Sequence, residues 1–175
     1  MPKANAPILV IEDDPGDFGL VQTYLRQAGL ERSDTVQAVV WATSLAQGIA
    51  RARSARPDVI LLDLSLPDSC GLATVQALRQ AVPEVPIVVL TGQVDSSLAL
   101  ATLESGAQDY LVKGCFDQDS LGRAVRYARI RARLEQELAR SVGLYAALSH
   151  CNQAIVHCSQ EGELLQAVCR IAVQF

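Results

Sequence analysis

From Pro7 to about Lys113, short runs of apolar, often β-branched residues alternate with longer segments of helical period. This alternation is typical of a parallel sheet whose strands are joined by helices on both faces. The runs that predict strands are residues 8–11, 35–41, 58–63, 86–91 and 109–113. Four of them lack a clean alternation of apolar and polar residues, as expected for strands buried on both faces. The predicted fold class is therefore α/β, with a doubly wound five-stranded parallel sheet.

The first predicted helix has the clearest limits. Asp14 is a suitable N-cap, Pro15 suits the first helical position, and Gly29 is a suitable terminator. The next three helices are expected at about residues 43–54, 71–82 and 95–106, the last of them capped by Asp95. Each one connects two of the predicted strands, as a doubly wound sheet requires.

A fifth helical pattern begins near Asp119 or Ser120 and continues to about Leu148 without a proline, which predicts a long C-terminal helical extension. Its later part repeats apolar residues at spacings of three and four: Leu134, Leu138, Val142, Tyr145 and Leu148. An exposed apolar stripe of this length normally has a partner. We therefore expect a parallel homodimer through this helix. Packing of the stripe on later residues of the same chain is the alternative.

The charge distribution argues against nucleic acid and membrane partners. The formal net charge is -4, which gives no general attraction to phosphate backbones or anionic lipids. Arginines recur between residues 123 and 133, but Glu135 and Glu137 follow two of them at a spacing of four, which favours an ion-paired helix face. The longest uncharged stretch, residues 141–160, contains polar side chains that are costly in hydrocarbon.

The cysteines and the N-terminus predict a cytoplasmic protein. The chain has 5 cysteines, an odd number, and none of them form a C-x-x-C pair. Free thiols are typical of a reducing compartment. The apolar run before Glu12 is too short for the core of a signal peptide.

Reactive side chains follow four of the predicted strands: Glu12, Asp13 and Asp14 after the first, Asp63 at the third, Thr91 at the fourth and Lys113 at the fifth. The carboxyl ends of parallel strands lie at one edge of a sheet, where functional groups gather. Carboxylates that converge there repel one another unless a cation lies between them, and oxygen ligands suit Mg²⁺. Taken singly, each residue has a plainer explanation, such as a helix cap at Asp14 or a strand-to-turn exit at Asp63.

Four segments, in this order and spacing, resemble the signatures of response-regulator receiver domains: ILVIEDDP, DVILLDLSLPDSCGL, VVLTG and DYLVKG. The resemblance covers residues 7 to about 130 and implies the flavodoxin-like strand order 2-1-3-4-5. By position it implies an acidic metal-binding pair at Glu12 and Asp13, the phosphoacceptor Asp63, a metal-binding backbone carbonyl at Ser65, switch residues Thr91 and Tyr110, and the phosphate-binding Lys113. Gly114 departs from the pattern, because many receivers have proline there.

The function implied by this resemblance is a regulatory switch rather than an enzyme. A sensor histidine kinase or a phosphotransfer protein would donate the phosphoryl group to Asp63 beside Mg²⁺. An aspartate-dependent phosphohydrolase is one alternative, but its usual second aspartate is replaced here by Ser65. A receiver-shaped interaction module that is not phosphorylated is the other.

The last thirty or so residues resemble the opening helices of a GAF sensor domain. We therefore expect a receiver domain at residues 7–130 and, at residues 131–175, a signalling helix with the truncated start of a GAF-like domain. The chain would then be a fragment of a longer signalling protein. Its output would be a cyclic-di-GMP synthase or hydrolase, or a histidine kinase, and the sequence does not choose among them.

Overall fold

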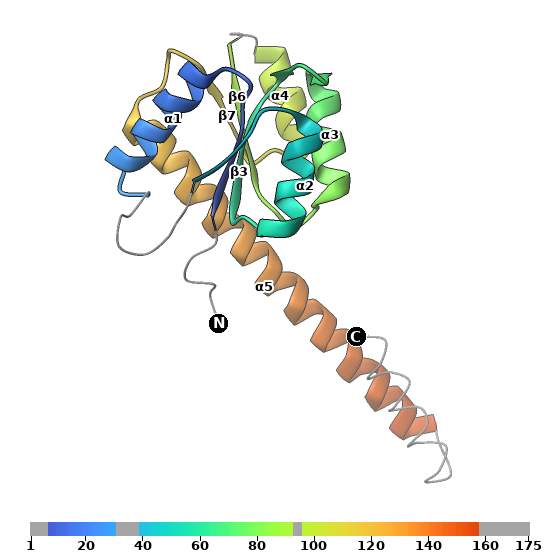
Figure 1. Ribbon diagram of the computed structural model, residues 1–175. Helices are drawn as coiled ribbons and strands as arrows, with labels where there is room; N and C mark the ends of the chain where they lie inside the picture. Colours follow the sequence, from blue (N-terminus) through green and yellow to red (C-terminus); the bar gives the residue numbers. More distant parts are fainter. Residues whose placement is uncertain (1–6, 31–38, 93–95, 158–175) are drawn as a thin grey trace. The chain divides into compact units, whose positions relative to one another are not determined.

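A computed structural model describes residues 7–30, 39–92 and 96–157. Its main sheet contains five parallel strands: β1 (Ile8–Ile11), β2 (Val39–Ala42), β3 (Val59–Asp63), β6 (Ile87–Thr91) and β7 (Asp109–Val112). They lie in the order β2-β1-β3-β6-β7 (Figure 1). Counting only these five strands along the chain, this is the predicted order 2-1-3-4-5. The predicted fold class is confirmed.

The burial of the three central strands explains why apolar and polar residues do not alternate along them. Every residue of β1, β3 and β6 is buried, because both faces of the sheet are covered. The edge strand β7 is only half-buried along its whole length.

The described residues form five helices: α1 (Pro15–Gln27), α2 (Leu45–Ala55), α3 (Leu72–Ala81), α4 (Ser96–Glu104) and α5 (Gln118–His157), of which the first four and the part of α5 up to Ala132 belong to the same compact unit as the sheet. On one face, Leu45 of α2 and Leu78 of α3 pack with the sheet, and we call this group the α2–α3 cluster. The other face is covered by α1 and the first part of α5 (Figure 1). Leu25 of α1 and Val125 of α5 pack there with the sheet, and we call this group the α1–α5 cluster. The sheet, including the edge at which its parallel strands end, is therefore packed against helices on both faces.

The predicted limits of α1 are confirmed. The Asp14 side chain accepts hydrogen bonds from the N–H groups of Gly16 and Asp17, and Pro15 is the first helical residue. At the other end, Gly29 has φ +70° and donates to the carbonyl of Arg26. This left-handed conformation is the reason for glycine at that position.

Other boundaries differ from the sequence-based prediction. The second strand runs from Val39 to Ala42, and residues 35–38 of the prediction lie outside the described part, as does Asp95. α5 begins at Gln118 because Asp117 is its cap, accepting a hydrogen bond from the Ser120 N–H at 2.9 Å. The helix therefore begins one or two residues before the predicted start near Asp119 or Ser120.

The structure also contains a pair of short strands outside the predicted five-stranded sheet. A short antiparallel pair, β4 (Ser65–Leu66) and β5 (Ser69–Cys70), follows Asp63 directly. The hairpin forms because the buried Leu66 anchors one strand against the α2–α3 cluster.

The chain divides into two compact units, Met1–Ala132 and Arg133–Phe175. Within the first, α5 buries five apolar residues at helical spacing: Leu121, Ala124, Val125, Ala128 and Ala132. Within the second, α5 exposes Leu134, Leu138, Val142, Tyr145 and Leu148, the stripe expected from the sequence. Among the described residues, no helix is long and apolar enough to cross a membrane.

Asp68, in the turn of the β4–β5 hairpin, caps a helix that begins 23 residues earlier in the chain. Its carboxylate accepts hydrogen bonds from the N–H groups of Leu45 at 2.8 Å and Ala46 at 2.9 Å, the first two residues of α2. Hydrogen bonds from Ala46 and Leu45 lower the pKa of Asp68 below its ordinary value of 3.8. The contact ties the segment after Asp63 to the start of α2.

We expect Asp68→Ala to lower the free energy of unfolding by about 1 kcal/mol, because two N–H groups of α2 lose their acceptor. Since the pKa of Asp68 is lower in the folded state, its contribution is present above pH 3.8 and is lost as the pH falls further. Urea unfolding at neutral and acid pH measures both effects. Asp68→Asn is the matched variant: it keeps one amide oxygen, so its loss should be smaller. Equal stability of Asp68→Ala and the wild type would contradict this role.

Candidate functional site

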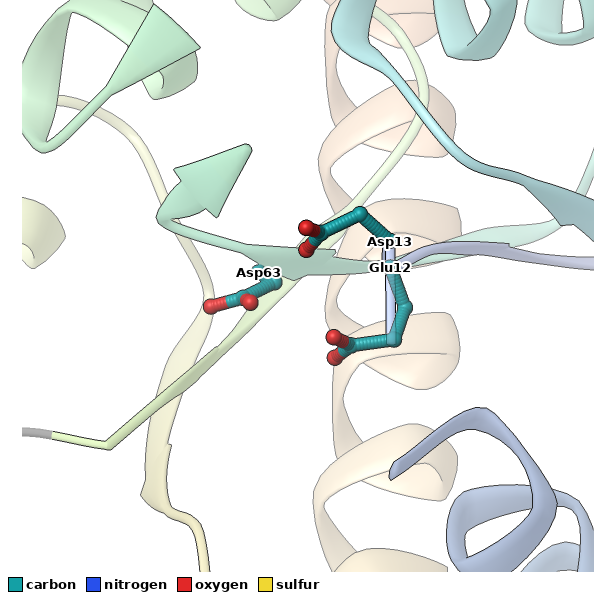
Figure 2. A group of neighbouring side chains, drawn as sticks. All are labelled: Glu12, Asp13 and Asp63. Carbon is teal, nitrogen blue, oxygen red and sulfur yellow. The ribbon is translucent and has the colours of Figure 1, made fainter. Parts of the chain in front are cut away.

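Three carboxylates converge at the edge of the sheet where the parallel strands end. Glu12 and Asp13 follow β1, and Asp63 is the last residue of the neighbouring strand β3 (Figure 2). One oxygen from each lies within 4.8 Å of the others. Glu12 and Asp63 are buried, whereas Asp13 is exposed. The structure thus brings together the three acidic side chains that the sequence predicted.

The main chain of Glu12 is held on both sides. Its N–H donates to the carbonyl of Ala42, and its carbonyl accepts a 2.7 Å hydrogen bond from the Trp41 indole N–H. Trp41 in turn stacks on Phe18, with ring centroids 4.5 Å apart. Arg51 also donates to the carbonyl of Trp41. These contacts hold the main chain at the end of β1, where Glu12 and Asp13 lie.

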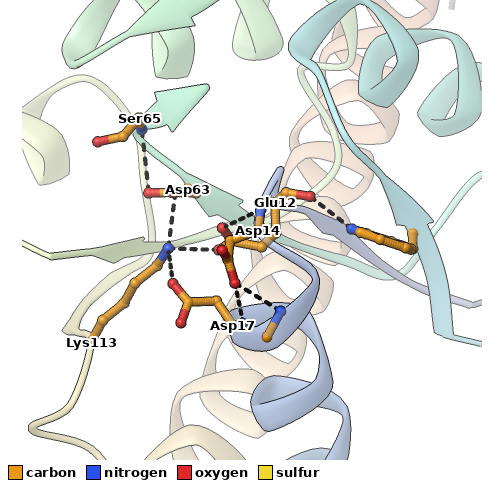
Figure 3. A network of polar contacts seen from close by, with 8 residues as sticks. Glu12, Asp14, Asp17, Asp63, Ser65 and Lys113 are labelled. Atoms are coloured by element: carbon orange, nitrogen blue, oxygen red, sulfur yellow. Dashed lines mark hydrogen bonds and ion pairs between the residues drawn. The ribbon is translucent and has the colours of Figure 1, made fainter. Parts of the chain in front are cut away.

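The ammonium group of Lys113 lies among three carboxylates. Its Nζ is 2.7 Å from Glu12 Oε2, 2.8 Å from Asp17 Oδ2 and 2.9 Å from Asp63 Oδ2 (Figure 3). Lys113 follows β7, and its N–H donates to the carbonyl of Thr91 at 2.7 Å. Gly114 comes next with φ +78°, a conformation that favours glycine.

The carboxylate and ammonium groups shift one another's protonation. Burial raises the pKa of Glu12 from 4.5 to about 7, against the opposing effect of its contact with Lys113. For Lys113, burial lowers the pKa, but hydrogen bonds to Asp17, Glu12 and Asp63 outweigh it and raise the pKa above its ordinary value. Lys113 is therefore positively charged at neutral pH, and one ammonium group only partly compensates its acidic neighbours.

The donor set fits a hard divalent cation. Carboxylate oxygens of Glu12, Asp13 and Asp63 are the ligand type that Mg²⁺ prefers. Glu12 Oε2 is buried, and it shares Lys113 Nζ, 2.7 Å away, with two other carboxylates. A second cation beside it would further offset the cost of burying this charge. The acidic cluster therefore has both the ligands and the electrostatic need for a metal ion.

The other predicted site residues, Ser65, Thr91 and Tyr110, lie on β4, β6 and β7. Ser65 is exposed, and its N–H donates to Asp63 Oδ1 at 3.2 Å. Thr91 is buried at the end of β6, and Tyr110 on β7 pairs with Val89, two residues before it. Because side chains alternate along a strand, Thr91 and Val89 point to the same face. Val89 and Tyr110 pack in the α2–α3 cluster, so both predicted switch residues lie on that side of the sheet.

Asp17 was missed by the sequence analysis. It lies in the first turn of α1, three residues after the cap Asp14, to which its N–H donates at 2.9 Å. Its place in the first turn of α1 was the available signal, because the helix that follows β1 begins at the same edge of the sheet as the acidic cluster. Its contact with Lys113 spans 96 positions of sequence, which no local pattern records.

We expect the metal-free protein to lose stability as Glu12 ionises. Because burial raises the pKa of Glu12, the stability from its protonated form is full below about pH 4.5 and is lost as the pH rises to about 7. Glu12→Gln keeps an acceptor for the Asp14 N–H but cannot ionise. Near pH 8, it should raise the free energy of unfolding by roughly 1 to 3 kcal/mol, each unit of pKa shift being worth about 1.4 kcal/mol.

Urea unfolding in a chelating buffer, at about pH 5 and about pH 8, measures this difference. Glu104→Gln is the matched control, because it removes an exposed carboxylate on α4. The same pH dependence in wild type and Glu12→Gln would show that Glu12 is not the group responsible.

Comparison with known proteins identifies the family. A family model described as "Response regulator receiver domain" matches residues 8–126. The "DNA-binding response regulator MtrA" of Mycolicibacterium smegmatis is 37% identical over 129 residues, which are 74% of this chain and 50% of that protein. The "KDP operon transcriptional regulatory protein KdpE" of Escherichia coli is 33% identical over 132 residues, covering 75% and 52%. The chain thus spans about half the length of these two relatives.

Solved structures agree with the sequence relatives. The crystal structure of a response regulator receiver domain protein from Clostridium thermocellum matches with a TM-score of 0.63 at 25% identity, covering 74% of this chain and 98% of that one. The family match includes every strand and the predicted site from Glu12 to Lys113. The chain therefore belongs to the response regulator receiver domain family of two-component systems.

Proposed function

We propose that Asp63 accepts a phosphoryl group from a sensor histidine kinase or a phosphotransfer protein in the cytoplasm, and that the domain acts as a switch rather than as an enzyme. The observation that carries the proposal is the 2.9 Å contact of Lys113 Nζ with Asp63 Oδ2 inside a cluster of three carboxylates. Membership of the receiver family supports it. The same family membership argues against the alternative of an aspartate-dependent phosphohydrolase.

In this proposal Glu12, Asp13, Asp63 and the Ser65 carbonyl would hold Mg²⁺, which would supply positive charge for the transferred phosphoryl group. Asp63 brings an anion to an anionic donor, so positioning and charge neutralisation dominate the chemistry. An Asp63 oxygen forms a bond to phosphorus while the bond from phosphorus to the donor histidine breaks, and that histidine keeps the electron pair. Lys113 donates to the transferred group.

We further propose that Thr91 and Tyr110 convert this local event into a change of packing. The Thr91 hydroxyl would donate to a new phosphoryl oxygen, and its movement would make room for Tyr110. Their location on the α2–α3 face supports this role: Tyr110 packs against the α2–α3 cluster, and strand alternation places Thr91 on the same face as Val89 of that cluster. A charge change at Asp63 would thus bias two arrangements of that face.

The output of the protein is also a proposal. We assign residues 7–130 to the receiver and residues 131–175 to a signalling helix followed by a GAF-like segment, most of which lies outside the described residues. The relatives are named as a DNA-binding response regulator and a transcriptional regulatory protein, but the match spans only about half of each. The GAF-like resemblance favours a cyclic-di-GMP enzyme or a histidine kinase as output over direct DNA binding.

We propose that the second unit forms a parallel homodimer through α5. The apolar stripe is largely exposed, with Leu138 at 66% and Tyr145 at 75%. Burying each such side chain contributes roughly 1.5 to 3 kcal/mol. The flanking Arg133–Glu137 ion pair at 2.9 Å is exposed and adds only about 0.5 kcal/mol, so the apolar residues must provide the affinity.

Acetyl phosphate with Mg²⁺ should add one phosphoryl group to the wild-type chain, measured by intact mass. Asp63→Asn should abolish this addition with the fold intact, because the amide cannot attack phosphorus. Removal of Mg²⁺ with a chelator should abolish it as well. Asp119→Asn is the matched control, because it removes an exposed carboxylate outside the site and should be labelled normally. Equal labelling of Asp63→Asn would refute the assignment.

Leu138→Glu should convert the proposed dimer to a monomer, because it places a charge in the centre of the stripe. Ala139→Glu introduces the same side chain about 100° further round the helix at an exposed position, and should leave the dimer intact. Sedimentation equilibrium at micromolar concentrations distinguishes the two. A monomeric wild type, or a dimer unaffected by Leu138→Glu, would count against the proposed interface.

A further inference from the structure

Asp17 differs from the other carboxylates that contact Lys113. Its side chain is 44% exposed, whereas those of Glu12 and Asp63 are almost fully buried. Glu12 and Asp63 belong to the acidic cluster with the ligand chemistry for a metal ion, and Asp17 does not. A metal ion in the acidic cluster would therefore compete with Lys113 for Glu12 and Asp63, but not for Asp17.

The ammonium group of Lys113 already contacts three anions in this arrangement: it donates hydrogen bonds to Asp17 and Asp63 and forms an ion pair with Glu12. An ammonium group has three N–H donors and no acceptor, and three carboxylates lie within 2.9 Å of its nitrogen. A phosphoryl group on Asp63 would bring further acceptor oxygens and about two negative charges. A hydrogen bond from Lys113 to one of these oxygens would compete with the contacts that Lys113 makes now.

We propose that Asp17 is a positioning residue that competes with the phosphoryl group for Lys113. The inference rests on the proposed function of Asp63 and deepens it. With Glu12 and Asp63 engaged by the metal ion, Asp17 is the remaining anion that holds Lys113 away from the phosphoryl oxygens. The charge of Asp17 thereby limits how tightly the phosphorylated state is held.

The position of Asp17 on α1 makes the competition specific. The Asp14 cap fixes the first turn of the helix through the N–H groups of Gly16 and Asp17. Asp17 thus reaches Lys113 from a rigid helix end rather than from a loop. A purely structural role would be stabilisation of α1, since acidic residues are favourable in the first turn of a helix. That role would affect stability but not the affinity for a phosphoryl analogue.

Beryllofluoride at saturating Mg²⁺ is a suitable probe, with bound and free ligand separated by fluorine NMR. Asp17→Asn should bind it about two- to fivefold more tightly than the wild type, the range typical of a partly exposed ion pair. Asp14→Asn is the matched control. It removes one negative charge at the same helix end and retains a good cap, so its affinity should stay close to that of the wild type. Asp17→Glu keeps the charge and should also remain near the wild type.

The outcomes separate this inference from the proposed function. If wild-type protein does not bind beryllofluoride, both fail. If it binds, but Asp17→Asn matches the wild type or Asp14→Asn, only the role of Asp17 is overturned. Tighter binding by Asp17→Glu as well would overturn it too, because the charge would then not be the restraining feature.

Discussion

Burial of Glu12 and Asp63 side by side at the end of a parallel sheet requires positive charge, and the rest of the site follows from that requirement. Lys113 supplies one charge from the end of β7, within 2.9 Å of both carboxylates. One ammonium group does not balance three or four anions, and burial raises the pKa of Glu12 to about 7 despite its contact with Lys113. A site with an excess of buried oxygen ligands is suited to take up a divalent cation and then an anionic group beside it. The geometry is therefore consistent with the receiver family to which the chain belongs.

The scaffold keeps this costly arrangement in place with packing that does not depend on the charges. The central strands are buried on both faces, so the strand ends that carry Glu12 and Asp63 have little freedom. Trp41 fixes the carbonyl of Glu12 from the neighbouring strand, and the Asp14 cap fixes the start of α1. On the other face, Asp68 joins the hairpin after Asp63 to the start of α2. Each acidic residue is thus attached to an element with its own stabilising contacts.

The two faces of the sheet take different parts in the proposed switch. Asp17 and Lys113 link the site to α1, whereas Thr91 and Tyr110 lie on the face covered by α2 and α3. A phosphoryl group on Asp63 would accept hydrogen bonds from Lys113 on the α1 side and from the Thr91 hydroxyl on the α2–α3 side. The proposed competition with Asp17 and the proposed movement of Tyr110 are then two consequences of a single new charge.

The sequence by itself determined the features that depend on neighbouring residues or on simple periodicity. These are the five main strands, the limits of α1 at Asp14 and Gly29, and the collection of Glu12, Asp13, Asp63 and Lys113 at one sheet edge. The strand order came from family resemblance, since periodicity does not specify which strands pair. Only the tertiary structure decided that Asp17 contacts Lys113, that Trp41 binds the carbonyl of Glu12, and that Asp68 caps α2. Those contacts join residues 96, 29 and 23 positions apart, so they exist only once separate segments have packed against the sheet. A local signal such as a cap acts within one helical turn, and no pattern at that range records where a distant side chain will lie.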